Sequence, residues 1–146
     1  MNAGASLHAQ FRRRACQADS NDMRLSIQSA GLYTYPDVIA VCGEQRFLDD
    51  QVDTLLNPSL IVEVLSPSTE AYDRGRKFEH YKTIEPLREY LITPDRIRAD
   101  LFVRQDDGRW LLTSADRLED TLSIESVQAQ LSLADLYEKV EFSQAG

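Results

Sequence analysis

Two short segments of the chain are almost continuously apolar. They are residues 37–42 (DVIAVC) and residues 60–65 (LIVEVL), and each follows a proline closely. Short apolar runs bounded by turn residues are typical of strands that are covered on both faces of a sheet. We therefore expect two inner strands, one opened by Asp37 and the other interrupted by Glu63.

Other segments show patterns that predict further strands. Residues 23–28 alternate apolar and polar side chains, which is the period of a half-buried strand. Residues 97–104 and 110–113 flank an Asp-Asp-Gly sequence that predicts a hairpin, and residues 87–92 predict one more strand. The polar and acidic residues 43–56 have no strong period and predict a surface loop.

Helical periods occur in three places. Residues 6–16 and residues 133–140 each space their apolar side chains as a short helix does. A third helix is expected over residues 70–84, where the preceding Ser-Thr pair can cap its first turn and the following proline ends it. Gly75 disfavours helix within this last segment.

Length and charge limit what the chain can be. At 146 residues, 42% of them hydrophobic, residues 1–146 are expected to form one α/β domain with a single core. The net charge is −8, so any contact with DNA has to be local rather than spread over the surface. Two basic clusters could supply such a contact: residues 12–14, and the group Arg74, Arg76, Lys77 and Lys82.

The chain shows no sign of export or membrane insertion. Its apolar runs are far shorter than the twenty or so residues of a membrane span, and the N-terminal region has arginines where a secretory signal needs apolar residues. We expect a cytoplasmic protein without a membrane partner. Cys16 and Cys42 lack the spacing of a zinc or redox motif, and we expect both to be reduced and structural.

The carboxylates inside the apolar runs need a physical explanation. Successive residues of a strand point to opposite faces, so Glu63 shares a face with Ile61 and Leu65. A carboxylate in such surroundings is costly unless it is paired or binds a cation. One explanation is an ion pair or a hydrogen bond to the backbone, and the other is a divalent cation that Asp37 and Glu63 hold from neighbouring strands.

These residues, together with those that follow them, match a family pattern. A Pro-Asp pair at residues 36–37, the run VEVLSPST at residues 62–69, and Asp73, Lys77 and Tyr81 beyond it resemble the Uma2-type restriction endonucleases of the PD-(D/E)xK nuclease superfamily. The resemblance extends from about Cys16 to the end of the chain. It implies a restriction-endonuclease-like fold, with a mixed central β-sheet flanked by helices.

The resemblance also implies a site for Mg²⁺ or Mn²⁺. Asp37 and Glu63 would bind the metal, and a lysine would position the attacking water or the scissile phosphate. The superfamily's simplest pattern has this lysine two residues after the glutamate, where this chain has Leu65. The resemblance instead assigns the role to Lys77 on the following helix.

Helical spacing supports that assignment. Asp73, Lys77 and Tyr81 lie at successive i,i+4 positions and share one helix face, although an ordinary surface pair of Asp73 with Lys77 would show the same spacing. Asp73 and Tyr81 are supporting candidates, and Arg74 either assists with phosphate or is simply solvated.

The function implied is a metal-dependent DNA endonuclease that works as a homodimer. The alternatives are a catalytically inactive nuclease fold that binds DNA or protein, and a metal-dependent hydrolase of another phosphoester. Chains of the family also carry a segment before the first helix, with an acidic residue near the metal. This chain does not show that segment, so we expect a domain shortened at its N-terminus.

Overall fold

The protein is described by a computed structural model that covers residues 2–20, 22–48 and 53–140. A mixed sheet of six strands runs through its centre in the order β1-β4-β6-β7-β8-β9. Its strands are β1 (Cys16–Ser20), β4 (Val38–Cys42), β6 (Leu60–Val64), β7 (Glu89–Thr93), β8 (Ala99–Arg104) and β9 (Trp110–Ala115). Strands β6 and β7 are parallel, and the other neighbours are antiparallel. The predicted α/β fold with a mixed central sheet is confirmed.

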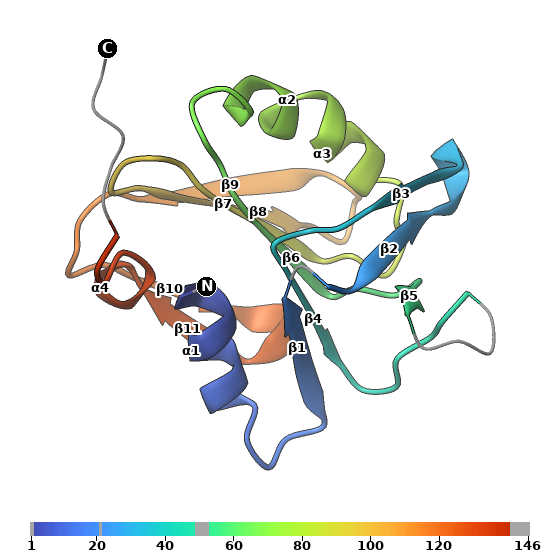
Figure 1. The fold of residues 1–146 in the computed structure, drawn as a ribbon, viewed down its shortest axis with the longest axis horizontal. Helices are drawn as coiled ribbons and strands as arrows, with labels where there is room; N and C mark the ends of the chain where they lie inside the picture. Colours follow the sequence, from blue (N-terminus) through green and yellow to red (C-terminus); the bar gives the residue numbers. More distant parts are fainter. Residues whose placement is uncertain (1, 21, 49–52, 141–146) are drawn as a thin grey trace.

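Helices and two small sheets cover the faces of this sheet (Figure 1). The helices are α1 (Asn2–Gln10), α2 (Glu70–Arg74), α3 (Arg76–Tyr81) and α4 (Leu133–Leu136), with short 3-10 turns η1 (Gln28–Ala30) and η2 (Glu125–Val127). One small sheet has the order β3-β2-β5, built from β2 (Arg24–Ile27), β3 (Leu32–Thr34) and β5 (Thr54–Leu55). The other pairs β10 (Thr121–Ile124) with β11 (Ala129–Ser132).

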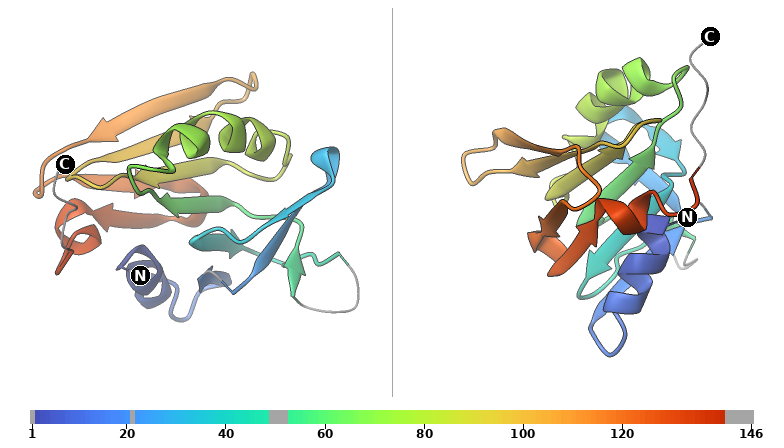
Figure 2. Two further views of the ribbon diagram at one scale, coloured as in Figure 1. Left: turned by 45° about the horizontal axis from the view of Figure 1, so that its top comes forward. Right: turned by 90° about the vertical axis from the view of Figure 1, so that its left-hand side faces the viewer.

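The strict alternation of side chains in the inner strands divides the core into two layers. Even-numbered residues of β4 and β6, such as Val38 and Val62, pack against α1, α4 and the β10-β11 pair. Odd-numbered ones, such as Ile39 and Ile61, pack against α3, β2 and β5. Figure 2 shows α2 and α3 on one side of the sheet and α1 with α4 on the other. Glu63 therefore points toward the layer under α3, as the alternation predicted.

Several predicted elements are confirmed with small shifts of their ends. The two apolar runs form β4 and β6, and the Asp-Asp-Gly hairpin joins β8 and β9. The helix expected over residues 70–84 is split into α2 and α3 at Gly75, whose φ of −101° and ψ of −95° are not helical. A Cβ at this position would lie 3.2 Å from the carbonyl oxygen of Ala71, so the split suits glycine. Thr69 occupies the N-cap position, but its side chain makes no capping bond, because it accepts from the amide of Ser66.

The N-terminal prediction was wrong in its bounds. The first helix covers Asn2–Gln10 rather than residues 6–16, and Cys16–Ser20 forms the edge strand β1. This strand is mostly polar, so its pairing with β4 stabilises it rather than any apolar period of its own. Of the loop expected over residues 43–56, Thr54–Leu55 forms β5 and Phe47 bridges to Leu55, while residues 49–52 lie outside the described residues.

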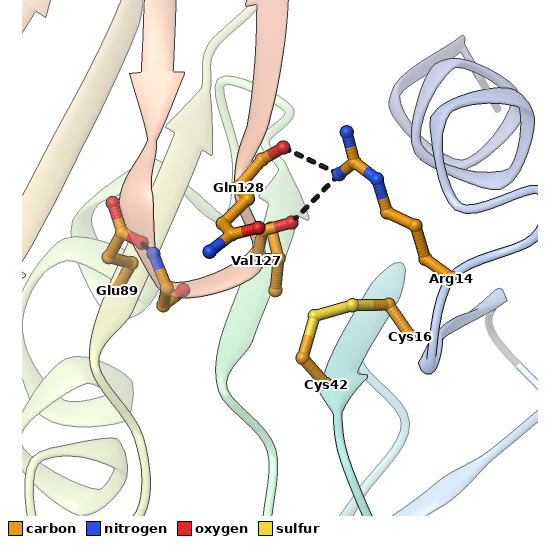
Figure 3. The surroundings of a disulfide bond; sticks show 7 residues. Arg14, Cys16, Cys42, Glu89, Val127 and Gln128 are labelled. Carbon is orange, nitrogen blue, oxygen red and sulfur yellow. Dashed lines mark hydrogen bonds between the residues drawn. A yellow bond between two sulfur atoms is a disulfide. The ribbon is translucent and has the colours of Figure 1, made fainter.

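The prediction that both cysteines are reduced was also wrong. Cys16 and Cys42 face each other in the register of β1 and β4 and form a disulfide (Figure 3). Arg14, just before β1, donates to the carbonyl oxygens of Val127 and Gln128, which attaches the same edge to η2. The pairing could not be foreseen, because the sequence pattern assigned Cys16 to a helix. No helix among the described residues is long and apolar enough to span a membrane.

Candidate active site

Two strands bring the candidate carboxylates side by side. Val38 in β4 is paired with Val62 in β6, and the same antiparallel register carried one residue further places Asp37 opposite Glu63. Directly opposed residues share a face of the sheet, with Cβ atoms roughly 5 Å apart. Asp37 Oδ2 accepts a hydrogen bond of 2.7 Å from the amide of Val64, which fixes this carboxylate at the end of β6.

Glu63 is buried, with 4% of its surface exposed. Its Oε1 accepts a hydrogen bond of 2.8 Å from the hydroxyl of Tyr81 and lies 3.0 Å from Nζ of Lys77. Burial raises the pKa of Glu63 to about 7, because the charges and hydrogen bonds of Lys77 and Tyr81 compensate only part of the lost hydration. The negative charge of Asp37 raises this pKa further.

Lys77 reaches Glu63 from helix α3. Its Nζ also lies 3.4 Å from Oδ1 of Asp73, one helical turn earlier, so the ammonium is held between two carboxylates. Burial alone would lower the pKa of Lys77, but Glu63 and Asp73 outweigh it and raise the pKa. Lys77 is therefore charged at neutral pH and points at Glu63.

The face formed by Asp73, Lys77 and Tyr81 is turned toward the sheet. Asp73 is 7% exposed and Tyr81 is fully buried. The pair of Asp73 with Lys77 is therefore not an ordinary surface pair. The hydroxyl of Tyr81 also lies 3.4 Å from Oγ1 of Thr34 at the end of β3. The i,i+4 spacing survives the break at Gly75: Lys77 and Tyr81 both contact Glu63, and Asp73 contacts Lys77.

Arg74 pairs with carboxylates other than Asp37, Glu63 and Asp73. Its Nε donates to Oε2 of Glu70, and its Nη1 lies 2.8 Å from Oδ2 of Asp100 in β8. Asp100 is 1% exposed and also accepts from Arg98 and Ser114. Arg74 is thus not simply solvated, because its side chain ties α2 to the sheet, and its assistance with phosphate stays a prediction.

Asp100 was missed by the sequence analysis, although the signal was available. It lies in the apolar stretch of β8 just as Glu63 lies in β6. The same reasoning about costly carboxylates in strands would have predicted a buried partner for it. Its partner, Arg74, lies on α2, directly after Asp73.

The donor set at the strand ends suits a hard divalent cation. Within the described residues, no hydrogen bond or ion pair engages Oδ1 of Asp37 or Oε2 of Glu63. Two carboxylates with free oxygens are what Mg²⁺ uses when water and phosphate complete its coordination. The same residues contain no group of three or more His, Cys, Asp and Glu placed to hold a metal by themselves. The pair therefore fits a cation that shares its ligands with solvent and substrate.

Comparison with known proteins identifies the family of the chain. A family model described as Uma2, "Putative restriction endonuclease", matches residues 2–135. An uncharacterized protein of Synechocystis sp., slr1290, is 35% identical over 128 residues, which cover 87% of this chain and 66% of the relative. A second one, sll1609, is 42% identical over 94 residues, or 64% of this chain and 53% of the relative. The chain thus spans slightly less than two thirds of one relative and about half of the other.

Proposed function

The chain belongs to the Uma2 family of restriction-endonuclease-like proteins, and from this premise we propose that it is a metal-dependent endonuclease that hydrolyses phosphodiester bonds of DNA. Asp37 and Glu63 would bind Mg²⁺ or Mn²⁺, and Lys77 would act with them. The observation that carries the proposal is the contact of 3.0 Å between Lys77 and a buried Glu63 beside Asp37.

The free-energy cost of burying the Glu63 carboxylate supports a functional role for this residue. A glutamate with a pKa near 7 is partly protonated at neutral pH, so its charged form is not fully compensated by the contacts it has in the fold. Strongly perturbed carboxylates next to a specific charge partner are more frequent at functional sites than elsewhere. A bound cation would supply the compensation that Glu63 lacks.

Each residue has a distinct task in the proposed reaction. A divalent metal, when bound, lowers the pKa of a coordinated water and stabilises charge on the phosphoryl oxygens. Asp37 and Glu63 present the two carboxylates from adjacent strand ends. Lys77 keeps its proton and directs its ammonium at the attacking water or the scissile phosphate, and Asp73 and Tyr81 orient Lys77 and Glu63.

The partners are proposed on the same basis. Duplex DNA is cut on both strands most simply by two copies related by a two-fold axis, so we propose a homodimer. We propose a cytoplasmic location, since the proposed activity requires access to DNA.

The test compares metal binding and cleavage in matched variants. Wild type, Asp37→Ala and Glu63→Ala are titrated with Mg²⁺ and Mn²⁺ by calorimetry and assayed on supercoiled and single-stranded DNA and on a small phosphodiester. Glu79→Ala is the control, because Glu79 is an exposed glutamate of α3 that pairs only with Lys82 among the described residues. We expect Asp37→Ala and Glu63→Ala to lose both binding and cleavage, and Glu79→Ala to keep both.

A second candidate is a nuclease fold without catalysis that binds DNA or protein. The net charge of −8 favours its protein-binding form, because an acidic surface opposes the approach of DNA. Metal titration distinguishes the two functions. If folded wild type binds neither Mg²⁺ nor Mn²⁺, the nuclease function is excluded and the second candidate remains. Cleavage of the small phosphodiester but not of DNA would instead indicate a hydrolase of another phosphoester.

A further inference from the structure

A polar cavity lies at the opposite end of the sheet from Glu63. It has a volume of about 720 Å³, within the range of small-ligand sites. Segments from η1, the residues before β6 and the connection from α3 to β7 line it, and it includes both Arg46 and Arg88. These segments meet on the right-hand side of the molecule in Figure 1, near β2 and β5. Nothing in the proposed nuclease site uses these residues.

The backbone holds both arginines in place. The amide of Arg46 donates to Oδ1 of Asn57 at 2.7 Å, and its carbonyl oxygen accepts from Leu56 at 2.8 Å. The amide of Arg88 donates to the carbonyl oxygen of Ser59 at 3.0 Å. Both side chains are exposed and start from fixed points of the backbone at the cavity wall.

The guanidinium groups keep donors for a ligand. No hydrogen bond or ion pair within the described residues reaches the guanidinium of Arg46, and Arg88 uses only Nη1, toward the carbonyl oxygens of Glu85 and Leu87. Ser26, 6% exposed, adds a hydroxyl at the wall that has no partner among the described residues. Glu85 also lines the cavity but forms no ion pair with either arginine there.

Three of the cations singled out from the sequence, Arg74, Lys77 and Lys82, pair instead with carboxylates of the chain itself. Arginines that have no carboxylate partner among the described residues, joined by hydroxyl and amide groups, are suited to phosphate, whose oxygens accept forked hydrogen bonds from guanidinium.

We propose that this cavity binds a phosphate group through Arg46 and Arg88, as a site separate from the carboxylate cluster. The phosphate belongs either to the backbone of a bound nucleic acid or to a free nucleotide. The nucleic-acid source rests on the proposed function. Asn57 lines the cavity and Glu63 belongs to the proposed metal site, and roughly 20 Å of extended chain separates the two residues. About six nucleotides of one strand cover that length, at 3.4 Å of helix axis per phosphate.

The test measures binding in EDTA, so that cleavage plays no part. Anisotropy of labelled single-stranded and duplex DNA is followed over a series of salt concentrations for wild type and the double variant Arg46→Gln/Arg88→Gln. The matched control is Arg109→Gln/Arg117→Gln, which removes the same charge from exposed arginines far along the chain. In parallel, inorganic phosphate and adenosine monophosphate are titrated into wild type while the arginine Nε–Hε signals are recorded by NMR.

Two results support the proposal and identify the source of the phosphate. A loss of about tenfold in DNA affinity and a salt slope smaller by about 2 in the cavity variant, with a smaller effect in the control, indicates a backbone phosphate. Shifts confined to the Arg46 and Arg88 signals, with unchanged DNA binding, indicate a free phosphate or nucleotide. Unchanged DNA binding together with no selective shift overturns the proposal. Absence of Mg²⁺-dependent cleavage would contradict the nuclease function but leave these results valid.

Discussion

Nζ of Lys77 lies 3.0 Å from Oε1 of Glu63, although the lysine comes from helix α3 and the glutamate from the buried strand β6. The contact places an ammonium beside a carboxylate that burial has removed from water. Leu65 stands two residues after Glu63, where the simplest form of the superfamily motif has a lysine, and under the proposed function Lys77 takes that role from the helix.

Replacing Glu63 should change how stability depends on pH. The folded pKa of about 7 exceeds the ordinary value of 4.5, so the contribution of Glu63 to folding is fully present below pH 4.5 and is lost as pH rises toward 7. Glu63→Gln removes this ionisation cost. We expect its free energy of unfolding at pH 8, in EDTA, to exceed that of wild type by about 3 kcal/mol. Urea titrations at pH 4.5 should show a much smaller difference, and equal differences at both pH values would contradict the pKa.

The disulfide between Cys16 and Cys42 should stabilise the edge of the sheet. It closes a loop with a sequence separation of 26, for which chain entropy predicts about 3 kcal/mol. We expect Cys16→Ser/Cys42→Ser to lose about this amount in chemical unfolding. Dithiothreitol should lower the stability of wild type and leave that of the double variant unchanged. Equal sensitivity of both proteins to the reductant would refute the bridge.

Asp100 should be needed for the attachment of α2. It is 1% exposed and receives Arg74, Arg98 and Ser114. Removing one partner of a buried ion pair leaves the other charge uncompensated, so we expect Asp100→Ala to cost about 3 kcal/mol of unfolding free energy. Asp107→Ala is the control, because Asp107 pairs with Arg109 at the exposed hairpin and should change stability little. Comparable losses in the two variants would argue against the buried network.

Tyr81 should matter through its hydroxyl. Tyr81→Phe removes the hydrogen bond of 2.8 Å to Glu63 while it keeps the ring in the core, and we expect cleavage to fall about tenfold with a loss of about 1 kcal/mol in stability. Tyr72→Phe removes a hydroxyl from an exposed tyrosine of the same helical region and should keep wild-type activity. Full activity of Tyr81→Phe would show that the hydroxyl has no part in the reaction.

The sequence predicted the inner part of the fold because that part is governed by local alternation. The runs that became β4 and β6, and the hairpin of β8 and β9, carry their own apolar period and turn residues. Strand β1 has no such period, because it is mostly polar and depends on pairing with β4. Strands β10 and β11 do alternate, but over only four residues each. Pairing between distant segments stabilises these strands, and a single sequence does not show it.

The candidate site, too, was predicted only in part. Alternation placed Glu63 on the face under the helix, and i,i+4 spacing grouped Lys77 with Asp73 and Tyr81. Neither argument shows how far α3 stands from β6. That distance is set by the packing of Phe78 and Tyr81 on the sheet and by the bond from Arg74 to Asp100. Spacing along the chain carries no information about such tertiary contacts.

The central claim is that Lys77 takes part in the cleavage of DNA at a metal site formed by Asp37 and Glu63. The most direct measurement is the rate at which wild type, Lys77→Ala and Lys82→Ala nick supercoiled DNA in Mg²⁺, with folding checked by circular dichroism. Lys82 lies in the same region but pairs with the exposed Glu79. The account predicts nicking by wild type and Lys82→Ala, and a loss of at least a hundredfold in Lys77→Ala. Equal rates in a folded Lys77→Ala and wild type would contradict it.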